Sequence, residues 1–196
     1  MRSDPVADRV ADAVRGSPAR LGGVRLVAVD GPSGAGKSTF ARRLVAALRA
    51  RGDAVALVST DDFATWDDPV SWWPRLAAVL DRLATGCPGS YRAWDWTSGL
   101  PRPGAVVEVP VPDVLVVEGV SSGRASVRLR LTRLCWVEGP DRARRLERAV
   151  ARDGESCRRH LEAWQRFEDG WFAVDDTRRH ADDVVQPEDG AAVVGA

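Results

Sequence analysis

One short stretch of the chain combines glycines, a lysine and a hydroxyl group at a fixed spacing. It fits the pattern G-x-x-x-x-G-K-[ST], with Lys37 and Ser38 as its last two residues. Glycines let the backbone curl so that successive N–H groups point at an anion, the lysine can reach the β- and γ-phosphates of a nucleotide, and the serine hydroxyl can ligate Mg²⁺. The pattern therefore predicts a phosphate-binding loop made of Gly31, Pro32, Ser33, Gly34, Ala35, Gly36, Lys37, Ser38 and Thr39.

Lys37 is the only lysine in the chain. The other basic side chains of the Lys/Arg type are all arginines, and asparagine is absent, which indicates a high-GC coding bias. An ammonium is a compact point charge that fits between two phosphates in a tight loop, whereas a guanidinium is broad and planar. We therefore interpret Lys37 as a phosphate ligand; a chance glycine-rich turn is the alternative interpretation.

Acidic residues follow two of the apolar runs. Asp61 and Asp62 come directly after the run AVALVS, and Glu118 lies at the end of the run DVLVVEG. A carboxylate in such a place can accept a proton from a hydroxyl or support Mg²⁺. We expect Glu118 to hold Mg²⁺ together with the loop serine, as a Walker B carboxylate does. The alternatives are a helix cap for the aspartates and a solvated strand end for the glutamate.

Two arginines lie on one face of a predicted helix. Arg148 and Arg152 are four residues apart in the segment RRLERAVARD. Guanidinium groups suit phosphoryl transfer because negative charge is spread over the oxygens of the transferring group. We predict that Arg152 is catalytic and that Arg148 contacts the substrate. The alternative is that both are solvated surface residues.

Aromatic and acidic residues alternate in the segment YRAWDWTSG, residues 91–99. Trp94 and Trp96 could stack on a flat substrate, and Asp95 could bind a pair of sugar-like hydroxyl groups. The alternative is that the tryptophans close a loop onto the core.

Strands and helices are predicted to alternate along the chain. β-Branched apolar runs predict strands at residues 24–30, 54–59, 113–119, 133–139 and 181–186. Helical periodicity predicts helices at residues 5–15, 38–52, 72–85, 141–153 and roughly 156–172. The order predicts an α/β fold of the P-loop NTPase type, with three α/β/α layers and a mostly parallel sheet of about five strands. Ligands of such sheets bind beyond the carboxyl ends of the strands.

Composition narrows the class of protein. The 196 residues carry 28 Lys and Arg against 28 Asp and Glu, which does not suggest a nucleic-acid or membrane-surface partner. No apolar run reaches the length of a membrane span. The three cysteines have no metal-type spacing, so we expect reduced thiols in a cytoplasmic protein.

Together these motifs resemble the uridine kinase family, which belongs to a wider group with pantothenate kinase and phosphoribulokinase. The resemblance covers roughly residues 22–186 and includes GPSGAGKST, TDDF, YRAWDW, VVEGV, RAVARD and ADDVV, in the order of the family. It implies that Asp61 is the catalytic base and that Asp62 is its neighbour, which we expect to bind the substrate; Asp62 as the base is the alternative. The chain departs from the family at Ala64, where a tyrosine is usual.

The same resemblance implies roles on the acceptor side and in a lid. YRAWDW is similar to the family's Tyr-Asp-Phe region, which places Tyr91 beside the acceptor and makes Asp95 a ligand of its hydroxyl groups. RAVARD is similar to the lid motif, which makes Arg148 and Arg152 phosphate contacts. The segment between Tyr91 and Glu118 is shorter and richer in proline than in uridine kinases.

We therefore expect a single P-loop kinase domain over residues 1–196, with a helical extension at 1–20 and a lid with its flanking helices at about 141–165. The expected activity is transfer of the γ-phosphoryl group from ATP, with Mg²⁺, to a hydroxyl of a small molecule, a nucleoside being favoured. A nucleoside-monophosphate kinase is the second hypothesis, with the acceptor phosphate held by Arg75, Arg82 or Arg92. An ATP-binding regulatory protein without turnover is the third. The sequence leaves the oligomeric state open.

Overall fold

A parallel sheet forms the centre of the molecule. The computed structural model describes residues 4–97 and 100–186. The strands of the sheet are β1 (Arg25–Asp30), β2 (Val55–Ser59), β5 (Val114–Glu118), β6 (Leu131–Val137) and β7 (Asp183–Val185). They lie in the order β2-β5-β1-β6-β7, and every neighbouring pair is parallel. The predicted α/β fold with a five-stranded sheet is confirmed.

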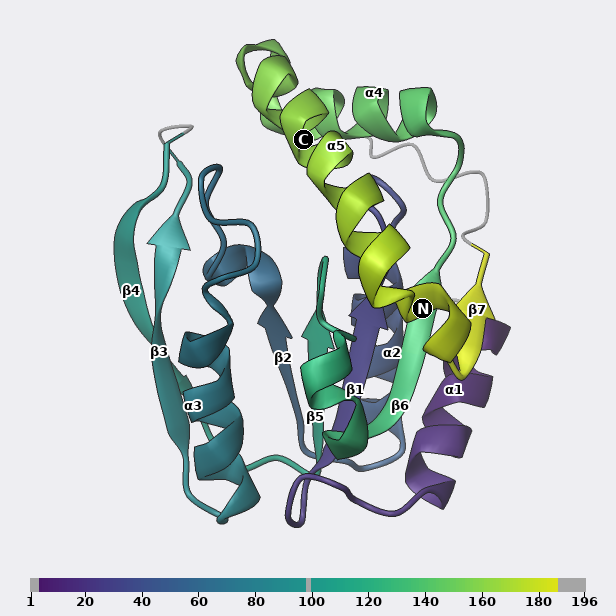
Figure 1. Cartoon of the computed structure of the whole chain (residues 1–196). Coiled ribbons are helices and arrows are strands. Elements are labelled where there is room, and N and C mark those ends of the chain that lie inside the picture. The colour runs from purple at the N-terminus through teal and green to yellow at the C-terminus, as the bar shows by residue number, and fades with distance from the viewer. Residues whose placement is uncertain (1–3, 98–99, 187–196) are drawn as a thin grey trace.

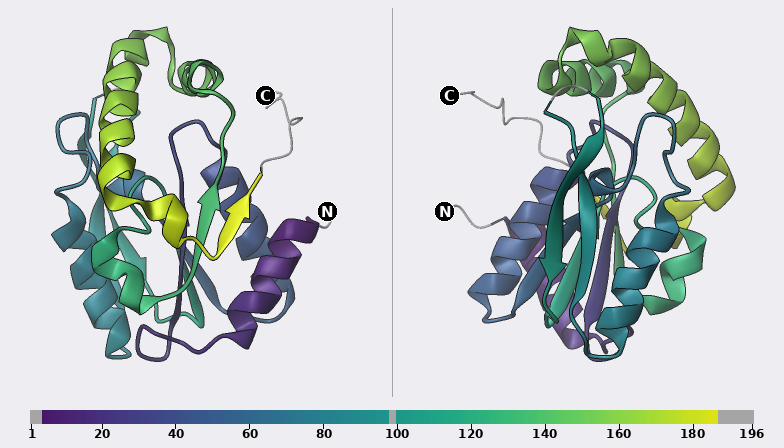
Figure 2. Two further views of the ribbon diagram at one scale, coloured as in Figure 1. Left: turned by 45° about the vertical axis from the view of Figure 1, so that its right-hand side comes forward. Right: turned by 90° about the vertical axis from the view of Figure 1, so that its left-hand side faces the viewer.

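Helices cover both faces of the sheet (Figure 1). The α-helices are α1 (Pro5–Gly16), α2 (Lys37–Ala50), α3 (Trp73–Ala84), α4 (Arg142–Asp153) and α5 (Arg158–Asp175). Short 3-10 helices are η1 (Thr60–Asp62), η2 (Ala125–Arg130), η3 (Glu155–Cys157) and η4 (Thr177–His180). The two turned views show α1 and α2 on one side of the sheet and α3 with η2 on the other (Figure 2). None of the helices in the described ranges is long and apolar enough to cross a membrane.

Each face of the sheet has its own apolar core. Side chains on one face, such as Val27 and Val116, pack against Leu44 of α2 and Val10 of α1. On the opposite face a second core is formed with α3. All five residues of β5 are buried, as a β-branched run in a central parallel strand should be. The sheet is therefore a rigid base whose carboxyl-terminal edge is fixed from both sides.

Two helices cross above that edge of the sheet. α4 begins after Asp141, whose side chain accepts a hydrogen bond from the backbone N–H of Arg144 and so caps the helix. α5 runs from beside α4 down to η4, which precedes the last strand (Figure 1). These helices correspond to the predicted segments 141–153 and 156–172.

An antiparallel hairpin was not predicted. β3 (Gly89–Asp95) pairs with β4 (Arg102–Val109), and the hairpin packs on α3 beside the edge of the sheet that carries β2 (Figure 2). The sequence analysis treated the first part of this region as an acceptor-binding segment. β4 opens with Arg-Pro-Gly, which is typical of a turn rather than a strand, and most of its residues are at least partly exposed, so no strong apolar alternation marks it.

Candidate active site

The glycine-rich segment forms a loop between β1 and α2. Gly31, Gly34 and Gly36 have φ angles of 142°, 74° and 100°, which side chains other than glycine rarely adopt. α2 starts at Lys37 immediately after the last of these glycines, so its unpaired N–H groups face the loop. The Lys37 side chain is 9% exposed, and its Nζ donates to the carbonyl oxygen of Pro32 at 3.0 Å. Ser38 and Thr39 occupy the first turn of the same helix.

Asp30 holds the start of this loop. Its fully buried carboxylate accepts hydrogen bonds from the backbone N–H groups of Gly31 at 2.7 Å, Ser121 at 3.1 Å and Gly123 at 2.8 Å. Burial raises the pKa of Asp30 to about 6, although these three donors and the charge of Lys37 favour the ionised form. Asp30 thereby ties the end of β1 to the segment that follows β5. The sequence analysis assigned it no role.

A hydroxyl–carboxylate pair lies beyond the loop. Ser38 Oγ donates to Glu118 at 3.1 Å, and Ser59 Oγ donates to the same carboxylate at 2.9 Å. Glu118 is buried, and burial together with the charge of Asp61 raises its pKa, while Lys37 and the two serines oppose that rise. The first turn of α2 and the ends of β2 and β5 thus bring these three groups together, although Ser38 and Glu118 are 80 residues apart in sequence.

This pair suits Mg²⁺. A hydroxyl and a carboxylate are hard oxygen ligands, and Mg²⁺ in nucleotide sites takes one or two protein oxygens and completes its shell with phosphates and water. The described residues contain no cluster of three or more His, Cys, Asp or Glu that could hold a metal ion alone. A cation held by Ser38 and Glu118 would take its remaining ligands from phosphates and water.

The two consecutive aspartates have different surroundings. Asp62 accepts a hydrogen bond from the Tyr91 hydroxyl at 2.6 Å, and burial raises the pKa of Asp62 more than this bond lowers it. Asp61 is exposed and, among the described residues, no hydrogen bond or ion pair engages its carboxylate. The structure thus keeps one carboxylate occupied and leaves the other open.

A cavity of about 560 Å³ lies between the glycine-rich loop, Asp61 and the helices α4 and α5. This volume falls in the range of small-molecule sites. Its polar lining consists of Ser33, Ser38, Arg42, Ser59, Asp61, Glu118, Arg152 and Asp153. Its apolar lining consists of Ala64, Trp66, Trp96, Cys157, Leu161 and Trp164. The predicted residues Asp61, Ser38, Glu118 and Arg152 are therefore brought together in one cavity.

Arg152 approaches this cavity from the end of α4. It is held by Asp153 through two hydrogen bonds of 2.6 Å. The pKa of the guanidinium is raised, chiefly by Asp153 and further by the charges of Asp61 and Glu118. Arg148 lies one turn earlier on α4, is exposed, and does not belong to the lining of this cavity.

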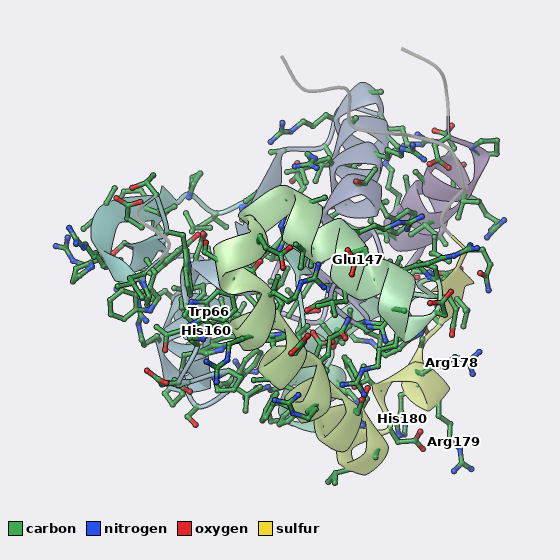
Figure 3. The ribbon with its side chains drawn as sticks, turned by 90° about the horizontal axis from the view of Figure 1, so that it is seen from above. Trp66, Glu147, His160, Arg178, Arg179 and His180 are labelled. Carbon is green, nitrogen blue, oxygen red and sulfur yellow. The ribbon has the colours of Figure 1, made fainter. Side chains whose placement is uncertain are left out.

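Tryptophans from three segments gather at the apolar end of the cavity. The indole of Trp66 stacks on His160 with ring centroids 5.1 Å apart, as Figure 3 shows from above. The rings of Trp96 and Trp164 meet Trp66 edge-on at 5.0 and 6.0 Å. The Nε1–H of Trp66 is buried and finds no acceptor among the described residues. Of the three cavity tryptophans, only Trp96 was considered in the sequence analysis.

The other residues predicted for the acceptor side lie outside the cavity lining. Trp94 donates from Nε1 to the carbonyl oxygen of Phe63 at 2.9 Å, and Tyr91 packs on the Phe63 ring at 4.5 Å. Asp95 is exposed and accepts from the N–H of Thr97 at 2.9 Å. Trp94 therefore supports the core below the cavity, while Trp96, two residues later, faces into the cavity.

The three arginines considered for an acceptor phosphate bind backbone carbonyls elsewhere. Arg75 donates to Phe63 and Arg92, Arg82 to Pro88, and Arg92 to Gly104. None of them belongs to the lining of the cavity. Arg42, which the sequence analysis missed, does line it from α2. Its position four residues after Ser38 places it one helical turn along and could have indicated this.

Comparison with known proteins supports the fold. No protein-family model and no curated protein matches the sequence. Among solved structures, the chain is similar to a possible uridine kinase from Bacillus stearothermophilus, with 17% identity, a TM-score of 0.67, and coverage of 91% of this chain and 96% of that chain. It is also similar to a putative fructose transport system kinase from Silicibacter sp. TM1040, with 20% identity, a TM-score of 0.63, and coverage of 91% and 98%. The predicted resemblance to uridine kinase-like P-loop kinases is confirmed at the level of the fold.

Proposed function

We propose that this protein is an ATP-dependent kinase that transfers the γ-phosphoryl group to a hydroxyl of a small molecule. The observation that carries the proposal is the shared cavity, which joins the phosphate loop to the open carboxylate of Asp61 and to Arg152. Phosphoryl transfer needs little more than positioning and charge stabilisation, and these groups can supply both.

Each group has a distinct part in the proposed reaction. Lys37 and the loop N–H groups would hold the β- and γ-phosphates. Ser38 and Glu118 would hold Mg²⁺, which would neutralise charge on the phosphate oxygens. Asp61 would orient the acceptor hydroxyl and accept its proton, because Asp62 is already bonded to Tyr91. Arg152 would stabilise the charge of the transferring group as α4 closes over it.

The apolar end of the cavity supports a nucleoside as the acceptor. Aromatic walls such as Trp66 and Trp96 favour a flat ring over a small, fully polar acid or sugar. The unpaired Nε1–H of Trp66 could donate to a ring substituent, since a buried donor without an acceptor costs free energy. The cited kinase neighbours support phosphoryl transfer as the reaction class but leave the acceptor open.

The presence of Arg42 in the cavity lining supports a phosphorylated acceptor as the second candidate. The arginines first considered for the acceptor phosphate bind backbone carbonyls elsewhere.

We also propose a cytoplasmic location. ATP and Mg²⁺ are available there, and the three cysteines are free thiols.

A phosphoryl-transfer panel tests the proposal. Purified protein with Mg²⁺ and ATP labelled in the γ-phosphate would be incubated with nucleosides, nucleoside monophosphates, sugars and hydroxy acids. We expect label to appear on a nucleoside. Transfer only to monophosphates would favour the second candidate, and binding of Mg·ATP without transfer to any acceptor would favour a regulatory protein.

A further inference from the structure

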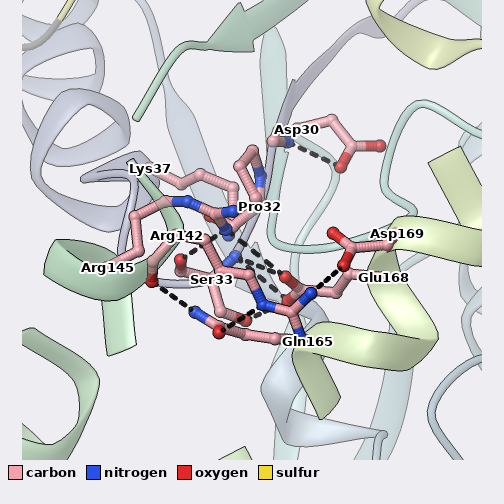
Figure 4. Close-up of polar contacts among 10 residues, drawn as sticks. Asp30, Pro32, Ser33, Lys37, Arg142, Arg145, Gln165, Glu168 and Asp169 are labelled. Carbon is pink, nitrogen blue, oxygen red and sulfur yellow. Dashed lines mark hydrogen bonds and ion pairs between the residues drawn. The ribbon is translucent and has the colours of Figure 1, made fainter. Parts of the chain in front are cut away.

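A carboxylate from α5 lies against the phosphate loop. The backbone N–H of Ser33 donates to both oxygens of Glu168 at 3.0 Å, and the Ser33 hydroxyl donates to the same carboxylate (Figure 4). Glu168 is 135 residues away from Ser33 in sequence and 1% exposed. Glutamate is almost never buried this completely unless it is paired. The loop therefore binds an anion that belongs to the chain itself.

Positive groups from two other helices surround this carboxylate. A guanidinium nitrogen of Arg145 in α4 lies 3.7 Å from a carboxylate oxygen of Glu168. The same nitrogen donates to the carbonyl oxygen of Ser33 at 3.2 Å. Lys37 of α2 is near enough that its charge lowers the pKa of Glu168, although burial raises that pKa by more. Backbone N–H groups, a lysine and an arginine are the donors that would otherwise hold a nucleotide phosphate. Glu168 thus occupies a phosphate-like position.

A polyphosphate bound in the loop would compete with this carboxylate for the same donors. Two like charges about 4 Å apart repel by several kcal/mol in a partly buried site. The Ser33 N–H can also serve only one anion well at a time. A nucleotide therefore has to displace Glu168 or bind with a penalty.

Displacement would affect the lid as well as the loop. Gln165, one turn before Glu168, exchanges hydrogen bonds with Arg142 of α4, and Asp169 forms an ion pair with Arg142 at 2.6 Å. Figure 4 shows these contacts beside the loop. The contacts between α4 and α5 therefore lie next to the contact between Glu168 and Ser33.

We propose that Glu168 is an internal competitor of nucleotide phosphate: it closes the phosphate loop in the free protein and must leave when nucleotide binds. This contact would lower the affinity for ATP and couple nucleotide binding to a rearrangement of α4 and α5. It would also keep the lid in contact with the loop when no nucleotide is bound. The inference rests on the proposed function, since it takes the loop to be the nucleotide site.

The test is a calorimetric titration of Mg·ADP and of tripolyphosphate into wild type, Glu168→Gln and Asp169→Asn. Glutamine keeps the size of the side chain but removes its charge, so both ligands should bind Glu168→Gln at least about tenfold more tightly than wild type. The matched control Asp169→Asn removes the neighbouring, half-exposed charge and should shift affinity by less than about threefold. Unchanged or weaker binding by Glu168→Gln, with normal binding by wild type, overturns the inference alone. Absence of binding in all three folded proteins overturns the proposed function.

A crystal structure of wild type with Mg·ADP gives an answer even if Glu168→Gln does not fold. The expected result is a phosphate oxygen on the Ser33 N–H and a carboxylate that has left it. A Glu168 carboxylate still 3.0 Å from Ser33 N beside the bound nucleotide overturns the inference.

Discussion

Lys37 is the only lysine of the chain, and its proposed role is to bind the phosphates of the nucleotide. Lys37→Ala should weaken binding of Mg·ATP and lower turnover by roughly a hundredfold or more. The reason is that the variant loses the positive charge that the protein holds against the transferring phosphoryl group. Lys37→Arg keeps the charge but should restore little activity, since a planar guanidinium does not fit a site shaped for a 9% exposed ammonium. Steady-state kinetics of the two variants check this. Turnover near wild type in Lys37→Arg would show that only charge matters there.

Asp30 makes stability depend on pH. Its pKa of about 6 in the folded protein exceeds the ordinary value of 3.8, so the folded state binds a proton more readily than the unfolded state between these values. Its contribution to stability is therefore largest below the ordinary pKa and falls as the pH rises through about 6. The Asp30→Asn variant has no carboxyl group at this position, so its stability should lack this contribution to the pH dependence.

Urea unfolding of wild type and Asp30→Asn at several pH values measures the effect. The free energy of unfolding of wild type minus that of the variant should decrease by up to about 3 kcal/mol between about pH 4 and pH 7.5. A difference that stays constant, or grows with pH, would mean that the three backbone donors and Lys37 outweigh burial.

Helix α4 and the glycine-rich loop approach each other closely at Gly34. A Cβ on Gly34 would overlap the backbone of Arg145 in α4, lying 2.9 Å from its carbonyl carbon. Gly34→Ala should therefore push α4 off the loop, lower the melting temperature and weaken nucleotide binding.

Gly86 supplies a matched control for Gly34. Both glycines have a φ of 74°, but a Cβ at Gly86 would meet nothing within 4 Å. The strain common to both alanine variants is about 1–2 kcal/mol, so any larger loss in Gly34→Ala measures the loop–lid contact. Equal melting temperatures and equal nucleotide affinities would show that the contact contributes nothing.

The elements differ in how far the sequence could predict them. Apolar periodicity predicts the five sheet strands and the α-helices. The clearest case is β5, whose Val-rich sequence is typical of a fully buried strand. β3 and β4 escaped prediction because the pairing of the hairpin, not an apolar face, holds β4 in place. The roles of Trp94 and Trp96 could not be assigned from sequence either, because their contacts come from a distant segment: Trp94 donates to Phe63, and Trp96 donates to the backbone of Asp61 and packs on Trp66.

At the scale of the whole molecule, the site is assembled from groups far apart in sequence. The glycine-rich loop has a local pattern and was predicted, and Asp61 and Glu118 were predicted because each follows an apolar, β-branched run. No sequence motif marks Glu168 or Trp164. Their contacts, Glu168 with the loop and Trp164 with the cavity, form only when α5 crosses the edge of the sheet. The residues that the sequence did not reveal therefore lie on several elements: Asp30 on β1, Arg42 on α2, Trp66 after η1, and Trp164 and Glu168 on α5.

In the proposed reaction, Asp61 delivers an acceptor hydroxyl to a nucleotide held by the loop. The most direct measurement is the rate of phosphoryl transfer by Asp61→Asn, with ATP affinity measured in the same protein and Asp62→Asn as the neighbouring control. We predict a loss of at least about a hundredfold in turnover with ATP affinity nearly intact for Asp61→Asn, and a smaller loss for Asp62→Asn. Turnover near that of wild type in Asp61→Asn would show that Asp61 is not the base of a phosphoryl transfer in this cavity.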